Sequence, residues 1–267
     1  MEHSLLTAIL LSFIEGLTEF LPVSSTGHLI LADELLHVTG ERMVTFNIVI
    51  QLGAILAVVV LYFQRFWGLL RPQPNVPFSG LRGLWLLFLT SLPAGLAGLL
   101  FGSFIKKTLF APIPVLLALV TGAIFMLLVE ARPHKERVCS LDEITPRLAL
   151  GIGFFQTLAV VWPGFSRSAA TILGGMILGA SRKTAAEYSF VAAVPIMMAA
   201  TGYEFLKNWH LFSRDDLAFF ACGMLGSFFF ALLAVKVFIV LVSRMTLRPF
   251  AIYRLLLAPL VYWCMSY

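Results

Sequence analysis

The chain has few charged residues for its length. Of its 267 residues, 12% are charged and 60% are hydrophobic, whereas soluble domains carry about 25% charged residues. This leaves too little polar surface to cover a water-soluble globule. Apolar stretches of about 18 or more residues are long enough to cross a bilayer as helices, and several occur here. We therefore predict a single membrane domain over residues 1–267.

Cysteine is also scarce, and its spacing excludes the usual metal and disulfide patterns. Cys139, Cys222 and Cys264 are far apart and form no CxxC pair, so neither zinc nor a disulfide is expected. The N-terminus has no basic stretch before its apolar run, so we expect this segment to remain in the mature protein. The net charge of +5 comes without a basic, aromatic-interleaved patch, which argues against nucleic acid as a partner.

Six apolar segments are uninterrupted and two are broken. We predict transmembrane helices at about 43–63, 83–104, 112–130, 184–206, 217–242 and 249–266. The segments at about 4–38 and 148–181 are broken by a proline and a polar cluster, PVSSTGH at 22–28 and PGFSRS at 163–168. A proline followed by Ser or Thr ends one helix and caps the next, and irregular backbone at membrane depth must be buried in protein or line a wet cavity. Both segments are therefore predicted to be re-entrant helical hairpins.

The two broken segments also resemble each other. Shifted by 141 positions, Glu15 falls on Gln156, Pro22 on Pro163 and Ser25 on Ser166. A hairpin followed by three spans, occurring twice, inverts the second unit relative to the first. The predicted fold is thus an all-α integral membrane protein with an inverted-topology repeat, about 1–131 and 145–267. Lys and Arg gather in the connections near 65–82, 131–147, 182–183 and 244–248, which predicts a cytoplasmic side there and both termini outside.

Three charges fall within the broken segments. Glu15, Glu19 and Arg167 together cost on the order of 8–10 kcal/mol at a bilayer centre before compensation, so they need partners or a purpose. One interpretation is a structural ion pair that locks the hairpins together. Glu15 and Glu19 share a helix face at i,i+4, where like charges repel unless a cation lies between them. Their oxygens suit Mg²⁺ or Ca²⁺, so both are candidate metal ligands.

The polar clusters are expected at the N-termini of two half-helices, where free N–H groups favour an anion. Arg binds phosphate in a bidentate manner, so two such N-termini and one Arg suit a phosphate; the alternative is that the hydroxyls only cap helices. The residues concerned are Ser24, Ser25 and Thr26 in the first segment and Ser166, Arg167 and Ser168 in the second.

His28 follows the first cluster by one turn. We predict Ser25 as the nucleophile, with His28 as its base and Glu19 orienting His28; attack by His28 or by water are the alternatives. Gln51, inside a predicted span, either supports the site or bonds across helices. Glu130 and Asp142, which flank spans, are interpreted as solvated loop charges.

Two long motifs resemble the signatures of the undecaprenyl-diphosphatase family, the bacitracin-resistance proteins. They are EGLTEFLPVSSTGH at 15–28 and PGFSRSAAT at 163–171, and the likeness extends through QLGAILAVVV at 51–60 and PFAIYR at 249–254. Onto this chain the family's acidic pair maps to Glu15 and Glu19, its Ser-Ser-Thr to residues 24–26, its His to His28 and its Arg to Arg167. One departure is Ala169-Ala170, where many relatives have Gly-Ala.

The resemblance implies hydrolysis of undecaprenyl diphosphate to the monophosphate carrier of cell-wall synthesis, with a divalent cation and a site open to the outer face of the bacterial inner membrane. A polyprenyl-phosphate flippase would share the same topology but would not need an acidic pair beside Ser and His. The sequence is also compatible with a homodimer.

Overall fold

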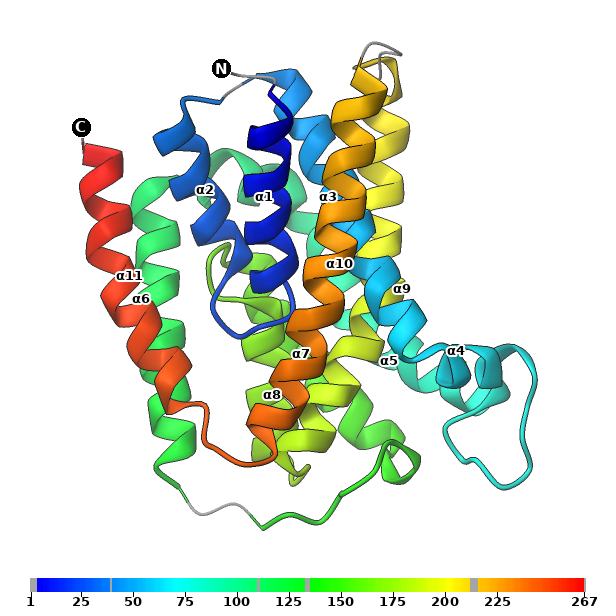
Figure 1. Ribbon diagram of the computed structural model, residues 1–267. Coiled ribbons are helices and arrows are strands. Elements are labelled where there is room, and N and C mark those ends of the chain that lie inside the picture. Colours follow the sequence, from blue (N-terminus) through cyan, green and yellow to red (C-terminus); the bar gives the residue numbers. More distant parts are fainter. Residues whose placement is uncertain (1–3, 39, 110, 133–134, 212–215, 267) are drawn as a thin grey trace.

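The computed structural model describes residues 4–38, 40–109, 111–132, 135–211 and 216–266, and these residues form helices and their connections, with one isolated bridge between Val138 and Ala180 (Figure 1). A short π-helical turn is formed by Ile105–Leu109, and two 3-10 turns are formed by Leu141–Glu143 and Trp209–Leu211. The helices are α1 (Leu5–Thr18), α2 (Ser25–Leu36), α3 (Glu41–Leu61), α4 (Phe63–Leu70), α5 (Gly80–Phe104), α6 (Pro112–Glu130), α7 (Pro146–Val161), α8 (Arg167–Ile177), α9 (Arg182–Asn208), α10 (Leu217–Val242) and α11 (Arg248–Ser266).

Five of the predicted spans are confirmed as helices long and apolar enough to cross a membrane. Among the described residues these are α3, α5, α6, α9 and α10. The predicted span at 249–266 coincides with α11, which is helical but is not in that group of five. Each broken segment is a pair of shorter helices, α1 with α2 and α7 with α8. The protein is therefore a multi-pass membrane protein whose described residues form helices and their connections.

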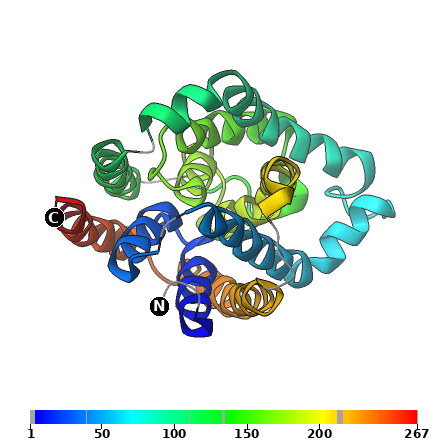
Figure 2. The same cartoon turned by 90° about the horizontal axis from the view of Figure 1, so that it is seen from above.

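The two helix pairs enter the bundle from opposite ends. In Figure 1, α1 runs from the upper end to a bend near the middle and α2 returns upward, whereas α7 rises from the lower end and α8 turns back down. Seen from above, α8 lies near the centre, with α5, α6, α10 and α11 towards the outside (Figure 2). The two bends are thereby brought to the middle of the molecule.

Each helix pair is supported by one long helix of the other half of the chain. α1 packs on α10 and α7 packs on α5, while α11 packs on α6. Close approach requires glycine: a Cβ on Gly16 would lie 2.7 Å from the Cβ of Phe230, and one on Gly153 would lie 2.7 Å from the Thr90 carbonyl oxygen. Small residues at such crossings are typical of helix packing in membranes.

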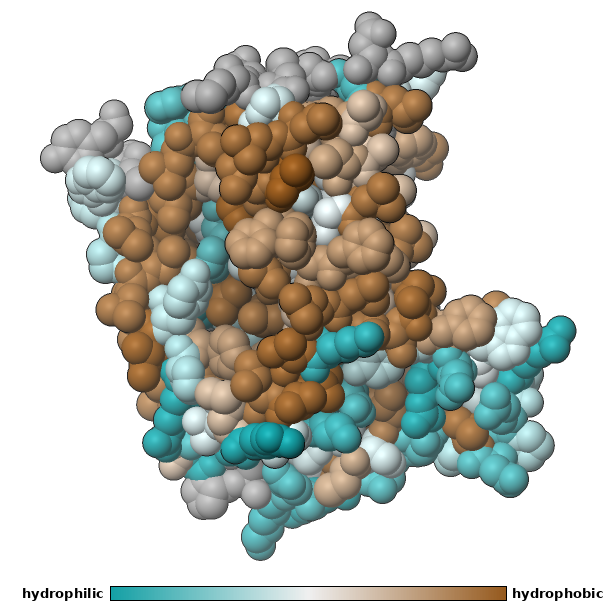
Figure 3. Space-filling model, in the orientation of Figure 1, coloured by the Kyte–Doolittle hydropathy of each residue, from teal (hydrophilic) through white to brown (hydrophobic). Residues whose placement is uncertain are grey.

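The surface shown in Figure 3 has an apolar belt, with hydrophilic residues gathered at the lower end and around α4. Side chains such as Leu99 and Phe229 are exposed within long apolar helices. The helix ends that meet the Lys- and Arg-rich connections, including those of α3, α6 and α10, all lie at this lower end (Figure 1). The charge pattern in the sequence thus corresponds to one end of the bundle.

Candidate active site at the meeting of the two bends

The bends of the two helix pairs contact each other directly. The Ser168 hydroxyl donates to the Leu21 carbonyl oxygen at 2.7 Å, and Arg167 Nη2 donates to the carbonyl and to the carboxylate Oε1 of Glu19 at 3.4 and 3.2 Å. These bonds join residues about 147 positions apart in the chain. The two bends therefore meet inside the bundle.

Each half-helix is preceded by an N-cap serine with a positive φ angle. Ser24 has φ 72° and Ser166 has φ 77°, and each side-chain oxygen accepts from the N–H three residues later, that of Gly27 at 3.4 Å and that of Ala169 at 3.2 Å. Non-glycine residues with positive φ are uncommon and cluster at functional sites. The predicted polar clusters therefore do begin half-helices.

The register predicted between the two units is wrong by one residue at this point. Ser24, not Ser25, occupies the position equivalent to Ser166, because both are the N-caps. The second bend has one more residue between its proline and its cap: two residues separate Pro163 from Ser166, but only Val23 separates Pro22 from Ser24. Ser25 and Arg167 are consequently equivalent, each being the first residue of its half-helix.

Ser25, Glu19 and Arg167 form a continuous chain of hydrogen bonds. The Ser25 hydroxyl donates to Glu19 Oε2 at 2.6 Å, and Arg167 Nη2 contacts Glu19 Oε1 at 3.2 Å. Arg167 also donates to the Ser189 carbonyl at 3.4 Å, and its guanidinium carbon lies 5.4 Å from the centre of the Phe20 ring. The serine hydroxyl is thus bonded to a carboxylate that a cation holds in place.

Glu15 lies one turn before Glu19 and is fully buried. Neither of its carboxylate oxygens has a hydrogen-bond partner among the described residues, although Glu19 and Arg167 are close enough to interact with it electrostatically. A buried carboxylate without hydrogen bonds is costly unless a cation or a proton compensates it. Because no group of three or more His, Cys, Asp or Glu gathers in the described parts of the chain, a cation here would need substrate oxygens to complete its shell.

His28 is bonded differently from the prediction. Its Nδ1 lies 2.7 Å from the Ser24 carbonyl oxygen and its Nε2 lies 2.7 Å from the Tyr253 hydroxyl. Both ring nitrogens are therefore engaged away from Glu19, while Glu19 bonds Ser25 directly. The hypothesis that Glu19 orients His28 as the base for Ser25 is corrected: in this geometry Glu19 is the group in contact with the serine proton.

The other predicted phosphate ligands are divided between the bends and the surrounding helices. Thr26 is half-buried in the first turn of α2, where N–H groups have no intrahelical partner, and Ser166 and Ser168 lie hydroxyl to hydroxyl at 3.0 Å. Gln51 is half-buried on α3, and none of the hydrogen bonds found among the described residues joins it to the bends. Whether Gln51 belongs to the site stays a prediction.

Two residues on α11 were missed as parts of this region. Tyr253 contacts His28, and the fully buried Arg254 donates to the carbonyl oxygens of Phe165, Ala118 and Gly164 at 2.9, 3.1 and 3.1 Å. Arg254 therefore fixes the second bend against α6. The sequence signal that could have identified Arg254 is its charge inside a predicted apolar span, in a segment that resembles the family.

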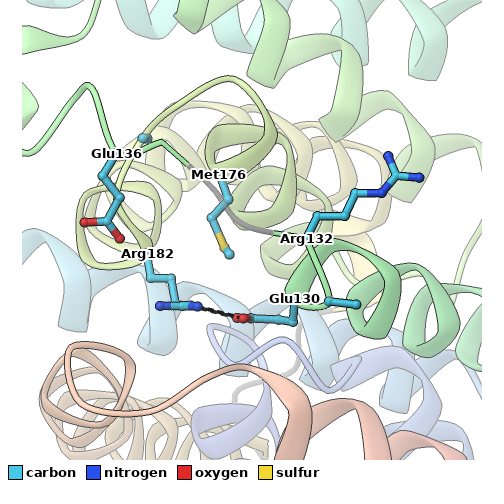
Figure 4. A pocket seen from close by; sticks show the side chains of 7 residues that line it. Glu130, Arg132, Glu136, Met176 and Arg182 are labelled. Atoms are coloured by element: carbon cyan, nitrogen blue, oxygen red, sulfur yellow. Dashed lines mark hydrogen bonds and ion pairs between the residues drawn. The ribbon is translucent and has the colours of Figure 1, made fainter.

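A second polar cluster lies away from the bends. It lines a cavity of about 380 Å³ whose walls include Glu130, Arg132, Glu136, Met176 and Arg182 (Figure 4). Glu130 is buried and receives two hydrogen bonds from Arg182, at 2.9 and 2.8 Å.

Two acidic residues expected to be solvated loop charges are in fact paired. Glu130 bonds Arg182 and also accepts from the backbone N–H of Leu247, and Asp142 pairs with Arg65 at 3.0 Å. Their interpretation as solvated loop charges is therefore wrong. None of the residues predicted to bind the phosphate lines the cavity beside Glu130.

Comparison with known proteins identifies relatives over nearly the whole chain. The family model described as bacitracin resistance protein BacA matches residues 8–260. A protein of Desulfovibrio desulfuricans named undecaprenyl-diphosphatase is 66% identical over 98% of this chain and 98% of its own. One of Nitratidesulfovibrio vulgaris with the same name is 65% identical (98% and 99%), and undecaprenyl-diphosphatase 1 of Bacillus cereus is 48% identical (95% and 96%). The chain belongs to the BacA family of bacitracin resistance proteins.

Proposed function

We propose that the protein hydrolyses undecaprenyl diphosphate to undecaprenyl phosphate and inorganic phosphate. Relatives at 58–66% identity over nearly their full length carry the name of this activity. In this protein the proposal rests on the hydrogen bonds that connect the Ser25 hydroxyl, Glu19 and Arg167. Release of inorganic phosphate from a C55 diphosphate by the purified protein in detergent tests it.

We infer that hydrolysis of this lipid recycles the carrier used in peptidoglycan synthesis and underlies the bacitracin resistance named in the family's description. A flippase of the same architecture is not favoured. Transport of a lipid phosphate needs an anion site, but it does not need a serine hydroxyl bonded to a carboxylate at 2.6 Å. That pairing is instead the arrangement of a nucleophile with its base.

In this proposal the terminal phosphate binds between the two bends. Arg167 offers a planar fork that can hold two phosphate oxygens, and the first N–H groups of α2 and α8 add donors at two helix N-termini. The hydroxyls assigned to this binding are those of Ser24, Thr26, Ser166 and Ser168, with Gln51 as a further candidate. When phosphate arrives, Arg167 can keep its contact with the Glu19 backbone carbonyl and turn its remaining N–H groups to the substrate.

The reaction proceeds in two steps. First, Ser25 Oγ attacks the terminal phosphorus while its proton passes to Glu19 Oε2, and the bond to the bridging oxygen breaks, so undecaprenyl phosphate leaves. Second, water attacks the phosphoserine, the Ser25 Oγ–phosphorus bond breaks, and Glu19 returns its proton to Oγ. The proton released by the water is assigned to His28 Nε2, since Nδ1 faces the Ser24 carbonyl.

A phosphoserine should therefore be trapped. We expect that acid quenching of a single turnover with substrate labelled in the terminal phosphate leaves acid-stable label on Ser25, and that Ser25→Ala carries none. Ser4→Ala, which changes the cap of α1 at the outer end of the same hairpin, serves as the control and should label normally. Acid-labile label on His28 would instead make the histidine the nucleophile, and absence of any adduct would favour direct attack by water.

A divalent cation, Mg²⁺ or Ca²⁺, fits the acidic pair. The two unpartnered oxygens of Glu15 and the carboxylate of Glu19 are hard ligands, and substrate oxygens would complete the shell. When bound, such an ion neutralises charge on the diphosphate and polarises its phosphorus–oxygen bonds. The chain's own part is to hold Glu15, on α1, and Glu19, the residue that follows α1, beside the anion site.

Removal of the cation is expected to abolish turnover. With excess chelator, phosphate release should fall by at least about a hundredfold, since a divalent ion contributes several kcal/mol of charge stabilisation to such reactions. Added Mg²⁺ or Ca²⁺ should restore it. Glu15→Gln should raise the cation concentration that gives half-maximal activity, because it removes a charged ligand oxygen. Full activity in chelator would contradict the assignment of Glu15 and Glu19 as ligands.

We place the protein in the bacterial inner membrane as six spans, with α11 as the sixth, and two re-entrant hairpins in two inverted units, about 1–131 and 145–267. The opposite entry of the two helix pairs supports this arrangement (Figure 1). The basic lower end is assigned to the cytoplasm, which leaves the mouth of the first hairpin and the route to Ser25 on the outer side. A homodimer stays a prediction.

A further inference from the structure

The contacts of His28 restrict how a proton can reach it. A carbonyl oxygen can only accept a hydrogen bond, so the 2.7 Å contact with Ser24 requires the proton of neutral His28 to be on Nδ1. The lone pair of Nε2 then faces the Tyr253 hydroxyl at 2.7 Å. Because both nitrogens are committed, a proton that His28 accepts in this geometry arrives through the Tyr253 hydroxyl.

Tyr253 is well fixed for such a task. Its ring stacks on that of His28, with centroids 5.6 Å apart and an interplanar angle of 9°. The next residue, Arg254, bonds three carbonyl oxygens of α6 and the second bend. At the same time, Tyr253 is 44% exposed, and its hydrogen bond with His28 lies at the surface of the protein. The tyrosine therefore connects the half-buried histidine with the surroundings.

We propose that Tyr253 is the proton relay and positioning residue for His28 in the second step of the reaction. The attacking water passes a proton to Tyr253 Oη as the tyrosine's own proton moves to His28 Nε2. One O–H bond forms and one breaks at Oη, the water oxygen becomes bonded to phosphorus, and His28 becomes an imidazolium. The relay rests on the proposed function, in which His28 receives the proton of that water.

Tyr253→Phe in the full-length protein tests the relay, because it keeps the stacked ring and removes only the hydroxyl. We expect kcat for phosphate release to fall about tenfold, as for the loss of one hydrogen bond to a reacting group, with KM nearly unchanged. The labelled phosphoserine should accumulate, since only its hydrolysis is slowed. Tyr203→Phe, the same change at an exposed tyrosine of α9, is the control and should behave as the wild type.

A second measurement does not depend on turnover. In the ¹⁵N spectrum of the histidine-labelled protein, with His28 assigned through His28→Gln, neutral His28 should carry its proton on Nδ1, and Tyr253→Phe should shift Nε2 towards the value of an unbonded nitrogen. If wild-type protein releases no phosphate, the proposed function fails while this spectrum still reports on the contact.

Three results would overturn the relay. The first is an unchanged Nε2 resonance in Tyr253→Phe. The second is an unchanged kcat despite a shifted resonance. The third is a slower reaction without accumulation of phosphoserine, which would place the defect in the first step. Absence of a covalent intermediate in the wild-type protein would also overturn the relay as stated, because its step is the hydrolysis of that intermediate.

Discussion

Glu19→Gln is expected to reduce kcat by at least about a thousandfold. General-base catalysis alone contributes about 10²–10⁴, and an amide cannot take the proton of Ser25, whose hydroxyl lies 2.6 Å from the carboxylate. The substitution also leaves Arg167 without the carboxylate that it contacts at 3.2 Å, so the orientation of the phosphate ligand suffers as well. Initial rates of phosphate release from the C55 diphosphate, with saturating cation, measure the effect.

The matched control for this variant is Glu34→Gln, which makes the same change at an exposed carboxylate of the same hairpin. It should retain wild-type activity. Because Glu19 bridges the two bends, the melting temperature of each variant should be compared to separate catalysis from folding. If Glu19→Gln is folded and its kcat is within about tenfold of wild type, Glu19 is a structural ion-pair partner, as one interpretation of the sequence allows. A loss of that size is below the effect of removing a general base.

Arg167→Lys is expected to lose about a hundredfold or more of kcat although it keeps the positive charge. An ammonium group cannot reproduce the planar fork on two phosphate oxygens, and contacts to developing charge are commonly worth 10²–10³ in rate. Lysine would also lose the paired contacts that Arg167 makes with the Glu19 carbonyl and the Ser189 carbonyl. Steady-state kinetics should show a larger fall in kcat than rise in KM.

Arg147→Lys provides the control, since it makes the same exchange at an exposed arginine in the first turn of α7, within the same hairpin. Turnover close to wild type in Arg167→Lys would mean that the guanidinium only ties the two bends together. A rise in KM with unchanged kcat would mean that Arg167 binds the ground state and the transition state equally.

The sequence was sufficient to locate both hairpins because the physical reasons are local. Pro22 and Pro163 each interrupt an apolar run just before a capping serine. The cost of charges at membrane depth makes an ion pair between the two broken segments one interpretation of the sequence. The structure shows Glu19 and Arg167 in contact at 3.2 Å. Five of the six predicted spans are likewise recovered as long apolar helices.

The partners of individual side chains could not be predicted in the same way. α1 ends at Thr18, so the direction of Glu19 depends on the path of the bend, and this path turns its carboxylate to Ser25 instead of His28. The partners of Arg254 are backbone carbonyls from two other segments, which have no signature in residue type. The one-residue offset between Ser24 and Ser166 arises from loop length, which a constant shift between repeats cannot represent.

The meeting of the two bends also constrains how the protein is made. Arg167 is synthesised 148 residues after Glu19. The first hairpin is therefore complete well before the arginine whose positive charge compensates the Glu19 carboxylate. A carboxylate without its partner is costly inside a bilayer, which favours holding the first hairpin at the water interface or in a protonated form until α8 inserts. Biogenesis therefore delays the assembly of the catalytic centre until the second half of the chain has entered the membrane, so a truncated nascent chain is expected to be inert towards its lipid.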